Sequence, residues 1–538
     1  MLHEGFSREN SKNGGEQPHM SERTRQPKWL DNAVFYEIYP QSFQDTNADG
    51  IGDLEGIIRH LDDIQELGCT AIWLNPCFQS PFGDAGYDVE DYCRVAPRYG
   101  TNEDMARLFE ESHRRNMHVI LDLVPGHTAV THRWFRESMK AEKNEYTDRY
   151  VWTDCVWESP DGMGCIRGIS DRDGSCAVNF FSHQPALNYG FYKPDKPWQQ
   201  SFDDPGPQAT LEAVKDVMRF WLKMGCDGFR VDMAGSLVKN DEEGKGTIRL
   251  WQNVRAFLDE EFPDAAMVSE WGEPDKSLQG GFHMDFLLQF GPSHYMDLFR
   301  CEEPFFSSRG KGNIAEFVHT YQKNYEKSER KGLICIPSGN HDMARLARKL
   351  QGDELKIAFA FLLSMPGAPF IYYGDEIGMR YVEGLTSVEG GYERTGSRSP
   401  MQWDDSVNAG FSHAPKECLY IQQDPAADRP TLKAQKQDPD SLYHEIQKLI
   451  QIRMAHPALQ SKGDIAYVYA EENAYPLAYV RSSEEEKILV VINPAARTVE
   501  FPYDGQTGEV LYQFGKGLSS DGSKITIHGQ SAVFVKIS

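Results

Sequence analysis

Apolar residues follow two periodicities along the chain, and these two patterns alternate. Short apolar runs at residues 33–39, 70–76 and 118–124 are typical of buried strands, whereas residues 54–67 and 104–115 carry apolar side chains at helical spacing. The pattern resumes after residue 205, with strands predicted at 228–232, 265–270, 282–286, 333–342 and 370–376 and helices at 211–224, 247–261, 314–327, 354–363 and 441–455. Such alternation predicts a parallel sheet covered by helices.

About eight strand-helix units can be counted, which is the number that closes a (β/α)8 barrel. We therefore predict an α/β fold, a TIM barrel built from residues 29–125 and 206–457. Residues 126–205 lack periodicity and predict an inserted, loop-rich subdomain after the third strand. Residues 458–538 read as short alternating runs, which predict a C-terminal antiparallel β-sandwich. Residues 1–28 are polar, and we expect a disordered tail that is neither a secretory signal nor a membrane anchor.

The charge balance narrows the range of partners. Lys and Arg number 56 and Asp and Glu 81, which gives a net charge of −25. Nucleic acids and anionic membranes bind basic surfaces, so neither is an expected partner. The ten cysteines show no metal-type pairing, and a cytoplasmic protein with reduced thiols is expected. A monomer and a dimer are both compatible with the sequence.

Candidate chemistry begins at residues 228–232, GFRVD, a buried strand that ends on an acid. Side chains alternate along a strand, so Arg230 and Asp232 point to the same face. We expect the guanidinium of Arg230 to keep Asp232 ionised, which suits a nucleophile. A structural ion pair explains this segment equally well.

Other predicted strands end on similar residues, namely Asp122 with His127, Glu270, and His341 with Asp342. In a closed barrel these strand ends meet at one mouth. Three carboxylates there can divide into a nucleophile, a proton donor and a group that stabilises a developing cation. Any one of them taken alone is more simply a barrel-rim ion pair.

The loop after the first strand, DTNADGIGD at residues 45–53, carries oxygen side chains at every second position. This spacing is typical of a loop that binds a hard cation such as Ca²⁺. Gly56 stands where an EF-hand has its bidentate glutamate, so the EF-hand pattern is only half met. We predict a single structural Ca²⁺ site, and the alternative is a polar turn without metal. Its ligands would be Asp45, Asn47, Asp49, the carbonyl of Ile51, and Asp53.

The motifs together resemble the α-amylase superfamily, glycoside hydrolase family 13, from about residue 29 to the C-terminus. They are YPQSFQD, AGYDVEDY, DLVPGH, GFRVD, SEWG and SGNHD. The resemblance implies that Asp232 is the nucleophile, that Arg230 orients it, and that Glu270 is the general acid/base. It further implies that Asp342 stabilises the transition state and binds sugar hydroxyls. His127 and His341 would hold the sugar, and Tyr87 would form an aromatic platform beneath it.

Two segments are similar to those of the oligo-1,6-glucosidase group: QPALN at residues 184–188 and ERTGSRSPMQW at residues 393–403. The resemblance implies that Arg394 pairs with Asp88 and closes the pocket around a terminal glucose, which makes an exo-acting enzyme. Gly126 replaces an asparagine that binds a second Ca²⁺ in other amylases, so that site is not expected. Met233 follows the nucleophile where relatives of different linkage specificity carry smaller side chains, and this leaves the linkage preference open.

The sequence is compatible with three functions. The leading one is a retaining α-glucosidase that hydrolyses short α-glucosides such as isomalto- or malto-oligosaccharides or sucrose. The second is a transglucosylase or a sucrose or trehalose isomerase that uses the same covalent intermediate. The third is a non-catalytic family member like the ectodomains of amino-acid transporter heavy chains, which lack the acids or carry a membrane helix. The sequence keeps all three acids, which disfavours this last reading.

Overall fold

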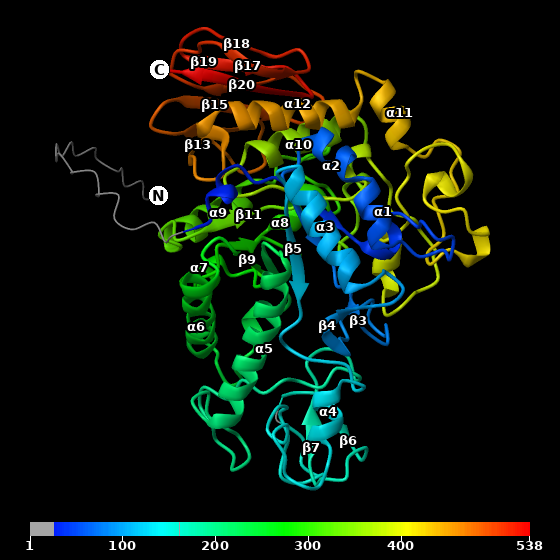
Figure 1. The fold of residues 1–538 in the computed structure, drawn as a ribbon. Coiled ribbons are helices and arrows are strands. Elements are labelled where there is room, and N and C mark those ends of the chain that lie inside the picture. The colour runs from blue at the N-terminus through cyan, green and yellow to red at the C-terminus, as the bar shows by residue number, and fades with distance from the viewer. Residues whose placement is uncertain (1–25, 161) are drawn as a thin grey trace, which may run out of the picture.

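The structure of the chain is a computed structural model that describes residues 26–160 and 162–538. Residues 1–25 of the predicted tail (residues 1–28) therefore lie outside the described residues. In the remaining chain, a barrel stands between two appended parts (Figure 1).

Eight parallel strands form the barrel, in the sheet order β11-β10-β9-β8-β5-β2-β1-β12. A parallel bridge between Pro337 and Phe370 closes the sheet on itself. The predicted (β/α)8 fold is thereby confirmed. The strands are β1 (Phe35–Ile38), β2 (Ala71–Leu74), β5 (His118–Leu123), β8 (Gly228–Val231), β9 (Ala266–Ser269), β10 (Met284–Phe286), β11 (Leu333–Cys335) and β12 (Phe370–Tyr372).

Helices cover the outside of this sheet. The predicted helix at residues 54–67 is two helices, because His60 leaves the helical conformation, with φ −105° and ψ 10°, and joins them. The strand predicted at residues 333–342 stops at Cys335, since Pro337 cannot donate to the ladder. The helices around the barrel are α1 (Leu54–Arg59), α2 (Leu61–Leu67), α3 (Asn102–Arg114), α5 (Pro205–Met224), α6 (Lys245–Glu261), α7 (Pro274–Gln279), α8 (Tyr295–Phe299), α9 (Ala315–Lys327), α10 (Asp353–Ser364), α11 (Leu432–Gln437) and α12 (Leu442–Ala455).

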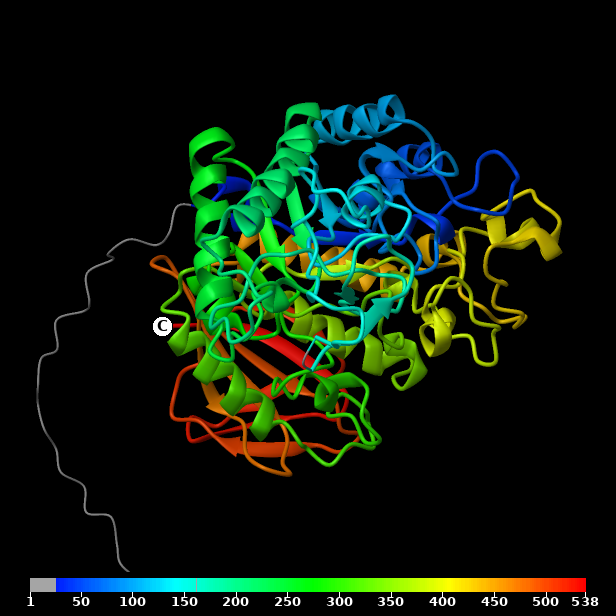
Figure 2. The ribbon, with the colours of Figure 1, turned by 90° about the horizontal axis from the view of Figure 1, so that it is seen from below.

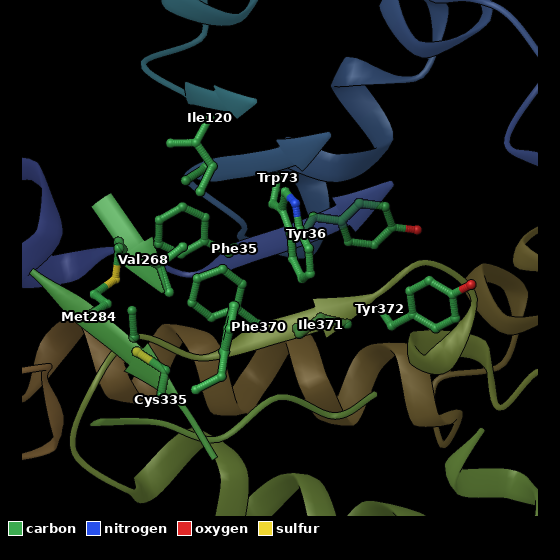
Figure 3. Close-up of a cluster of buried hydrophobic side chains, with 14 of the residues drawn as sticks. Phe35, Tyr36, Trp73, Ile120, Val268, Met284, Cys335, Phe370, Ile371 and Tyr372 are labelled. Atoms are coloured by element: carbon green, nitrogen blue, oxygen red, sulfur yellow. The ribbon is translucent and has the colours of Figure 1, made fainter. Parts of the chain in front are cut away.

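The barrel interior is a packed aromatic and aliphatic core. Figure 3 shows Phe35, Trp73, Ile120, Met284 and Phe370 pointing toward one another from different strands. The rings of Phe35 and Phe370 stack with centroids 4.2 Å apart, and all five side chains are at most 1% exposed. Such a core holds the strand ends in fixed relative positions, which is what a site built from several strands requires.

The segment between β5 and α5 extends from one end of the barrel (Figures 1 and 2). It contains α4 (Arg133–Ser138), β6 (Cys165–Arg167) and β7 (Ser175–Ala177), and otherwise consists of loops. Before it, β3 (Phe78–Gln79) pairs with β4 (Asp91–Val95). The loop-rich insertion after the third barrel strand is thus present.

A second long segment was not predicted. Residues 373–441, between β12 and α12, form turns, short 3₁₀ helices and α11. This segment folds back over the loop at residues 45–53, where the amide of Asp45 donates to the carbonyl of Phe411 over 2.9 Å and the amide of Tyr420 donates to Gly50 over 2.9 Å. It carries Arg394 and Arg398 to the barrel mouth.

The C-terminal part consists of two antiparallel sheets, in the orders β13-β14-β15-β20-β17 and β16-β19-β18. Leu489 and Val491 of the larger sheet pack against Phe501 and Ile525 of the smaller one. This is the predicted β-sandwich, and Figure 1 shows it at the end of the barrel away from the insertion. Its strands are β13 (Asp464–Tyr469), β14 (Leu477–Ser482), β15 (Lys487–Asn493), β16 (Val499–Pro502), β17 (Val510–Phe514), β18 (Leu518–Ser520), β19 (Lys524–Ile527) and β20 (Ser531–Ile537).

Among the helices of residues 26–160 and 162–538, none has the length and apolar character needed to cross a bilayer. The expected cytoplasmic location stays a prediction.

Candidate active site

A cavity of about 690 Å³ lies at the carboxyl ends of the barrel strands. Six residues predicted from the sequence line this cavity, namely Tyr87, His127, Asp232, Glu270, Asp342 and Arg394. Asp84, which was not predicted, lines it as well. Its mouth is lined by the aromatic side chains of Phe180, Phe181, Phe290 and Tyr392. A cavity of this volume, with convergent acids and aromatic walls, accommodates a small sugar.

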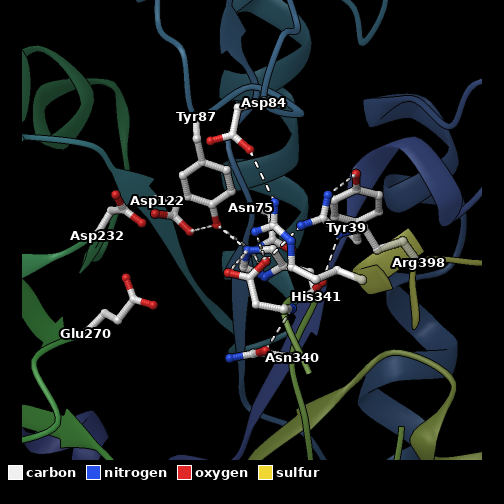
Figure 4. A network of polar contacts seen from close by, with 12 residues as sticks. Tyr39, Asn75, Asp84, Tyr87, Asp122, Asp232, Glu270, Asn340, His341 and Arg398 are labelled. Carbon is white, nitrogen blue, oxygen red and sulfur yellow. Dashed lines mark hydrogen bonds and ion pairs between the residues drawn. The ribbon is translucent and has the colours of Figure 1, made fainter. Parts of the chain in front are cut away.

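One guanidinium holds the two carboxylates at the centre of the site. Nη1 of Arg230 lies 3.0 Å from Oδ1 of Asp232, and Nη2 lies 2.9 Å from Oε2 of Glu270. The backbone amide of Met233 also donates to Oε2 of Glu270 over 3.0 Å. Because both acids contact neighbouring nitrogens of one planar group, Asp232 and Glu270 stand side by side, and Figure 4 shows them next to Tyr87 and Asp122.

The protonation of Asp232 differs from the sequence-based expectation. Burial, followed by the negative charge of Glu270, raises the pKa of Asp232 well above its usual range, although Arg230 acts in the opposite direction. Arg230 also binds Asp122, with Nη1 and Oδ1 2.8 Å apart, so its charge is divided among three carboxylates. Arg230 alone therefore does not set the pKa of Asp232, which burial and the adjacent Glu270 hold above its usual range.

Behind the pair, a buried polar network fixes Tyr87. Its hydroxyl donates to Oδ2 of Asp122 over 3.0 Å and lies 2.7 Å from Nε2 of His341. Nδ1 of His341 lies 2.9 Å from Oε1 of Glu37. Burial lowers the pKa of His341 to about 3, so its ring is neutral at neutral pH and supports Tyr87 by hydrogen bonding.

Asp342 lies on the opposite side of the cavity, in a strongly positive setting. Its Oδ1 accepts from Arg394 and from Arg398, each over 2.8 Å. Burial opposes the charge of Asp342, but His341, Arg398 and Arg394 outweigh it and hold the pKa of this carboxyl well below its usual range. Asp342 is therefore ionised throughout the neutral range, as a group that stabilises positive charge must be.

The predicted ion pair between Asp88 and Arg394 is wrong. Asp88 is 0% exposed, and its carboxylate accepts hydrogen bonds from the amides of Gly83 and Asp84 and from the hydroxyl of Ser80. The acid that faces Arg394 is Asp84, with Oδ1 3.7 Å from Nη2. Asp84 lies in the turn whose amides bind the carboxylate of Asp88. Asp88 therefore stabilises the conformation that directs Asp84 into the cavity, but it does not line the cavity itself.

The two predicted histidines occupy different positions. His127 lines the cavity, with Nε2 3.0 Å from the carbonyl of Tyr87 and Nδ1 3.1 Å from the amide nitrogen of Asn179. Burial lowers the pKa of His127 to about 3, so it is a neutral hydrogen-bonding group. His341 is 0% exposed and lies behind Tyr87 and Asp342. Arg230 does not line the cavity either, and it contributes to the site by binding the carboxylates of Asp232 and Glu270.

The predicted calcium loop is folded by its own hydrogen bonds. Oδ1 of Asp45 accepts from the amides of Asn47 and Ala48, and its Oδ2 accepts from Gly50 and from the hydroxyl of Ser412. These four bonds use every lone pair of that carboxylate. Asp49 accepts one bond, from the amide of Ile51, and Asn47 accepts one from Asp49.

The fifth predicted ligand, Asp53, accepts from the amide and hydroxyl of Thr46 with one oxygen and from the amide of Gly56 with the other. The side chains of Asn47 and Asp49 therefore keep oxygen lone pairs that could bind a cation, whereas those of Asp45 and Asp53 already accept several hydrogen bonds. The loop fits a cation in part. Calcium stays a prediction for this loop, and no step of the chemistry below uses it.

A separate group of possible metal ligands lies at the amino ends of the strands. Within the described part of the chain, His113, His118 and Asp227 are the one group of at least three His, Cys, Asp or Glu residues whose ligand atoms lie within 4.8 Å of one another. Nε2 of His113 and Nδ1 of His118 are 2.8 and 3.0 Å from the carboxylate oxygens of Asp227. These hydrogen-bonded ion pairs account for the cluster without a metal.

Sequence reasoning missed several residues of the site. Asp84 stands four residues before Asp88, and Gly86 between them signals a turn that could have pointed to it. Arg398 is the second arginine of the quoted segment ERTGSRSPMQW. Gln184 was read only as part of a motif, yet its amide nitrogen donates to Oδ2 of Asp84 over 2.8 Å. The aromatic mouth carried no signal, because its residues come from separate loops.

An aspartate and a glutamate side by side at the mouth of a (β/α)8 barrel are the arrangement expected of an enzyme that cleaves or rearranges glycosidic bonds. The model of the α-amylase catalytic domain matches residues 37–462, and the chain belongs to this family of carbohydrate-processing enzymes.

Several known proteins are similar to the chain over most of its length. Trehalose synthase/amylase TreS of Mycobacterium tuberculosis is 33% identical over 523 residues, which cover 88% of this chain and 82% of that protein. Oligo-1,6-glucosidase of Parageobacillus thermoglucosidasius is 31% identical over 543 residues, 88% of this chain and 92% of that protein. The crystal structure of isomaltulose synthase from Erwinia rhapontici superposes with a TM-score of 0.79 at 26% identity and covers 96% of this chain and 100% of that one.

The setting of Asp84 predicts a pH-dependent stability. Burial raises its pKa to about 6, against hydrogen bonding by Gln184 and the charge of Arg394. A raised carboxyl pKa contributes stability at low pH that is lost as the pH rises through about 6. Asp84→Asn removes this dependence, so its free energy of unfolding relative to wild type should increase by about 1 kcal/mol from pH 5 to pH 8. Denaturant titrations at the two pH values measure this difference, with the exposed Asp91→Asn as the control. A pH-independent difference would contradict the buried, protonatable state of Asp84.

Proposed function

We propose that the chain is a retaining, exo-acting α-glucosidase that hydrolyses short α-glucosides such as isomalto- and malto-oligosaccharides or sucrose. The observation that carries the proposal is the contact of Asp232 and Glu270 with one guanidinium. Inverting glycosidases keep their two carboxyl groups about 6.5–9.5 Å apart to admit a water molecule, whereas retaining enzymes keep them about 5 Å apart. Two acids on neighbouring nitrogens of Arg230 leave no room for that water.

The proposed reaction has two steps. Glu270 gives its proton to the glycosidic oxygen while an oxygen of Asp232 attacks C1, so the bond from C1 to the leaving sugar breaks and a β-glucosyl ester forms. Glu270 then takes a proton from water, whose oxygen attacks C1 and releases Asp232. When the first step begins, Glu270 must carry its proton and Asp232 must be ionised, and the bound glycosidic oxygen is the acceptor of that proton.

The end of the cavity supports exo action. Arg394 bridges Asp342 and Asp84, and Gln184 of the insertion holds the other oxygen of Asp84. Segments from three parts of the chain thus close one wall. A terminal glucose can occupy the pocket, with its hydroxyl groups facing the ionised Asp342, while a chain that continues past this wall cannot.

Replacing the nucleophile tests the chemistry. Asp232→Asn should lower kcat on 4-nitrophenyl α-glucoside by about 10⁴-fold or more, because an amide cannot form the ester, while the circular dichroism spectrum stays native. In Glu270→Gln, the same substrate should form the ester faster than water can remove it. Mass spectrometry of the digested variant should find a glucosyl group on the peptide that contains Asp232. An adduct on another residue, or turnover close to wild type in Asp232→Asn, would refute the assignment.

A second candidate is a transglucosylase or isomerase that uses the same intermediate. It is favoured by the similarity to a trehalose synthase and to an isomaltulose synthase, and by the aromatic cavity mouth. Phe180 and Tyr392 are 55% and 63% exposed, and such faces can stack on a released sugar and hold it for re-attack.

Product analysis separates the two functions. We expect maltose, isomaltose or sucrose to give the free monosaccharides, with ¹⁸O from labelled water at C1 of the released glucose. Chromatography of the products and mass spectrometry of the glucose measure both. Accumulation of an isomeric disaccharide without incorporation of ¹⁸O would replace hydrolysis by the second candidate.

We further propose a structural Ca²⁺ at residues 45–53, held by Asp45, Asn47, Asp49, the carbonyl of Ile51, and Asp53. Ca²⁺ would hold this loop in the form that hydrogen-bonds to the segment at residues 373–441, which brings Arg394 to the cavity. Chelation should then lower Tm, and Ca²⁺ should restore it to a larger extent than Mg²⁺ does. Asp49→Ala should abolish the response, whereas the exposed Asp91→Ala should not. An unchanged Tm in chelator, with no metal in the dialysed protein by elemental analysis, would exclude this site.

A further inference from the structure

Asp285, on β10, is a buried acid that the proposed chemistry does not use. It is 0% exposed, and one of its oxygens, Oδ1, accepts from the hydroxyl of Ser269 over 2.7 Å and from the amides of Trp271 and Gly272 over 3.2 and 3.4 Å. These three donors stand immediately before and after Glu270 in the chain. Asp285 therefore accepts hydrogen bonds from residues on both sides of the proposed general acid/base.

The turn after Glu270 is shaped to receive such an oxygen. Gly272 has φ +74°, the left-handed conformation, and consecutive amides in a turn of this kind converge on one point. Two converging amides form a concavity that binds an anionic oxygen. The carboxylate of Asp285 fills it, which an apolar side chain at this position could not do.

Burying this acid is costly, which argues for a specific role. Burial raises the pKa of Asp285 to about 7, even though the Ser269 hydroxyl and the two amides favour its charged form. Its second oxygen, Oδ2, has no hydrogen-bond partner within the described structure. Since a half-satisfied buried acid destabilises a fold, Asp285 is better explained by what it holds than by what it adds to stability.

The hydrogen bonds that the backbone of Glu270 itself makes come from one side only. Its amide donates to the carbonyl of Val231 over 2.9 Å, and its carbonyl accepts from the amide of Ala234 over 3.1 Å, both from the β8 side. On the β10 side, the ladder pairs β9 up to Ser269, and beyond that residue Asp285 supplies the contacts, with the amides of Trp271 and Gly272. General acid catalysis depends on the placement of the donor, and a shift of about 1 Å can cost about 100-fold in rate.

We propose that Asp285 is a positioning residue for Glu270, acting through hydrogen bonds to Ser269, Trp271 and Gly272. This inference rests on the proposed role of Glu270. Losing Asp285 frees the turn and displaces the proton donor, while Asp232 and Arg230 keep their places on β8. The defect should therefore appear only where the leaving group needs a proton.

The test compares two substrates of different leaving-group acidity. 4-Nitrophenyl α-glucoside releases a phenolate that needs little protonation, whereas maltose, isomaltose or sucrose, whichever is turned over fastest, releases a sugar that requires it. Asp285→Ala should lower kcat/KM on the disaccharide by about 100-fold and on the nitrophenyl glucoside by less than about 5-fold. Asp285→Asn keeps an acceptor oxygen without the charge and should restore most of the loss. If Asp285→Ala does not fold, Asp285→Ser takes its place with the same expectations.

Two control variants make the result specific. Glu376→Ala removes another buried acid, which accepts from the hydroxyl of Tyr36 over 2.8 Å, and should affect both substrates equally. Glu270→Gln should show the same selective loss as Asp285→Ala but more strongly, and equal losses in Glu270→Gln would overturn the proposed role of Glu270 itself. With that control in place, an equal loss on both substrates in Asp285→Ala, or none, overturns the positioning role. A selective loss that persists in Asp285→Asn overturns the hydrogen-bonding mechanism, because charge would then be the cause.

Discussion

The site depends on one buried guanidinium, that of Arg230. It is 1% exposed and contacts the carboxylates of Asp122, Asp232 and Glu270. Each acid would be unstable as an anion in this environment without a positive partner, and removing one member of a buried ion pair costs about 3–5 kcal/mol. Arg230 also fixes the geometry, because its planar shape sets Asp232 and Glu270 beside each other. The proposed retention rests on that spacing, so one interaction bears on both the stability of the acids and the stereochemistry proposed for the reaction.

The sequence predicted the parts of the molecule that depend on local pattern. Barrel strands carry apolar runs, their carboxyl ends must meet, and Asp232, Glu270 and Asp342 were found on that basis. The partner of Arg394 was not, because Asp84 and Asp88 occupy the same short segment and only the turn decides which one faces the cavity. The protonation of Asp232 was also missed, since it depends on Glu270, 38 residues away in the chain, as much as on the adjacent Arg230.

Elements outside the barrel repeat supply the substrate end of the cavity. Asp84 precedes the short strand β4, Gln184 belongs to the insertion, and Arg394 and Arg398 belong to the segment between β12 and α12. Barrel strands alone present acids around an open mouth. The added segments place two arginines on Asp342 and hold its pKa well below the usual range, whereas burial raises the pKa values of Asp84 and Asp232. The low pKa of Asp342 therefore depends on the loops that carry Arg394 and Arg398, whereas the raised pKa of Asp232 depends on burial and on Glu270 within the barrel.

The choice between water and sugar as acceptor depends on a different part of the site. Asp232, Glu270 and Arg230 are needed equally for both outcomes, since each begins with the same ester. What differs is how long the released sugar stays near Glu270 after the first step. The aromatic mouth is placed to affect this, because Phe180 and Tyr392 present exposed faces on which a released sugar can stack. In this proposal the acids and the closed wall define the glucosyl donor, while the acceptor is selected by side chains from loops, which are the most variable parts of a fold.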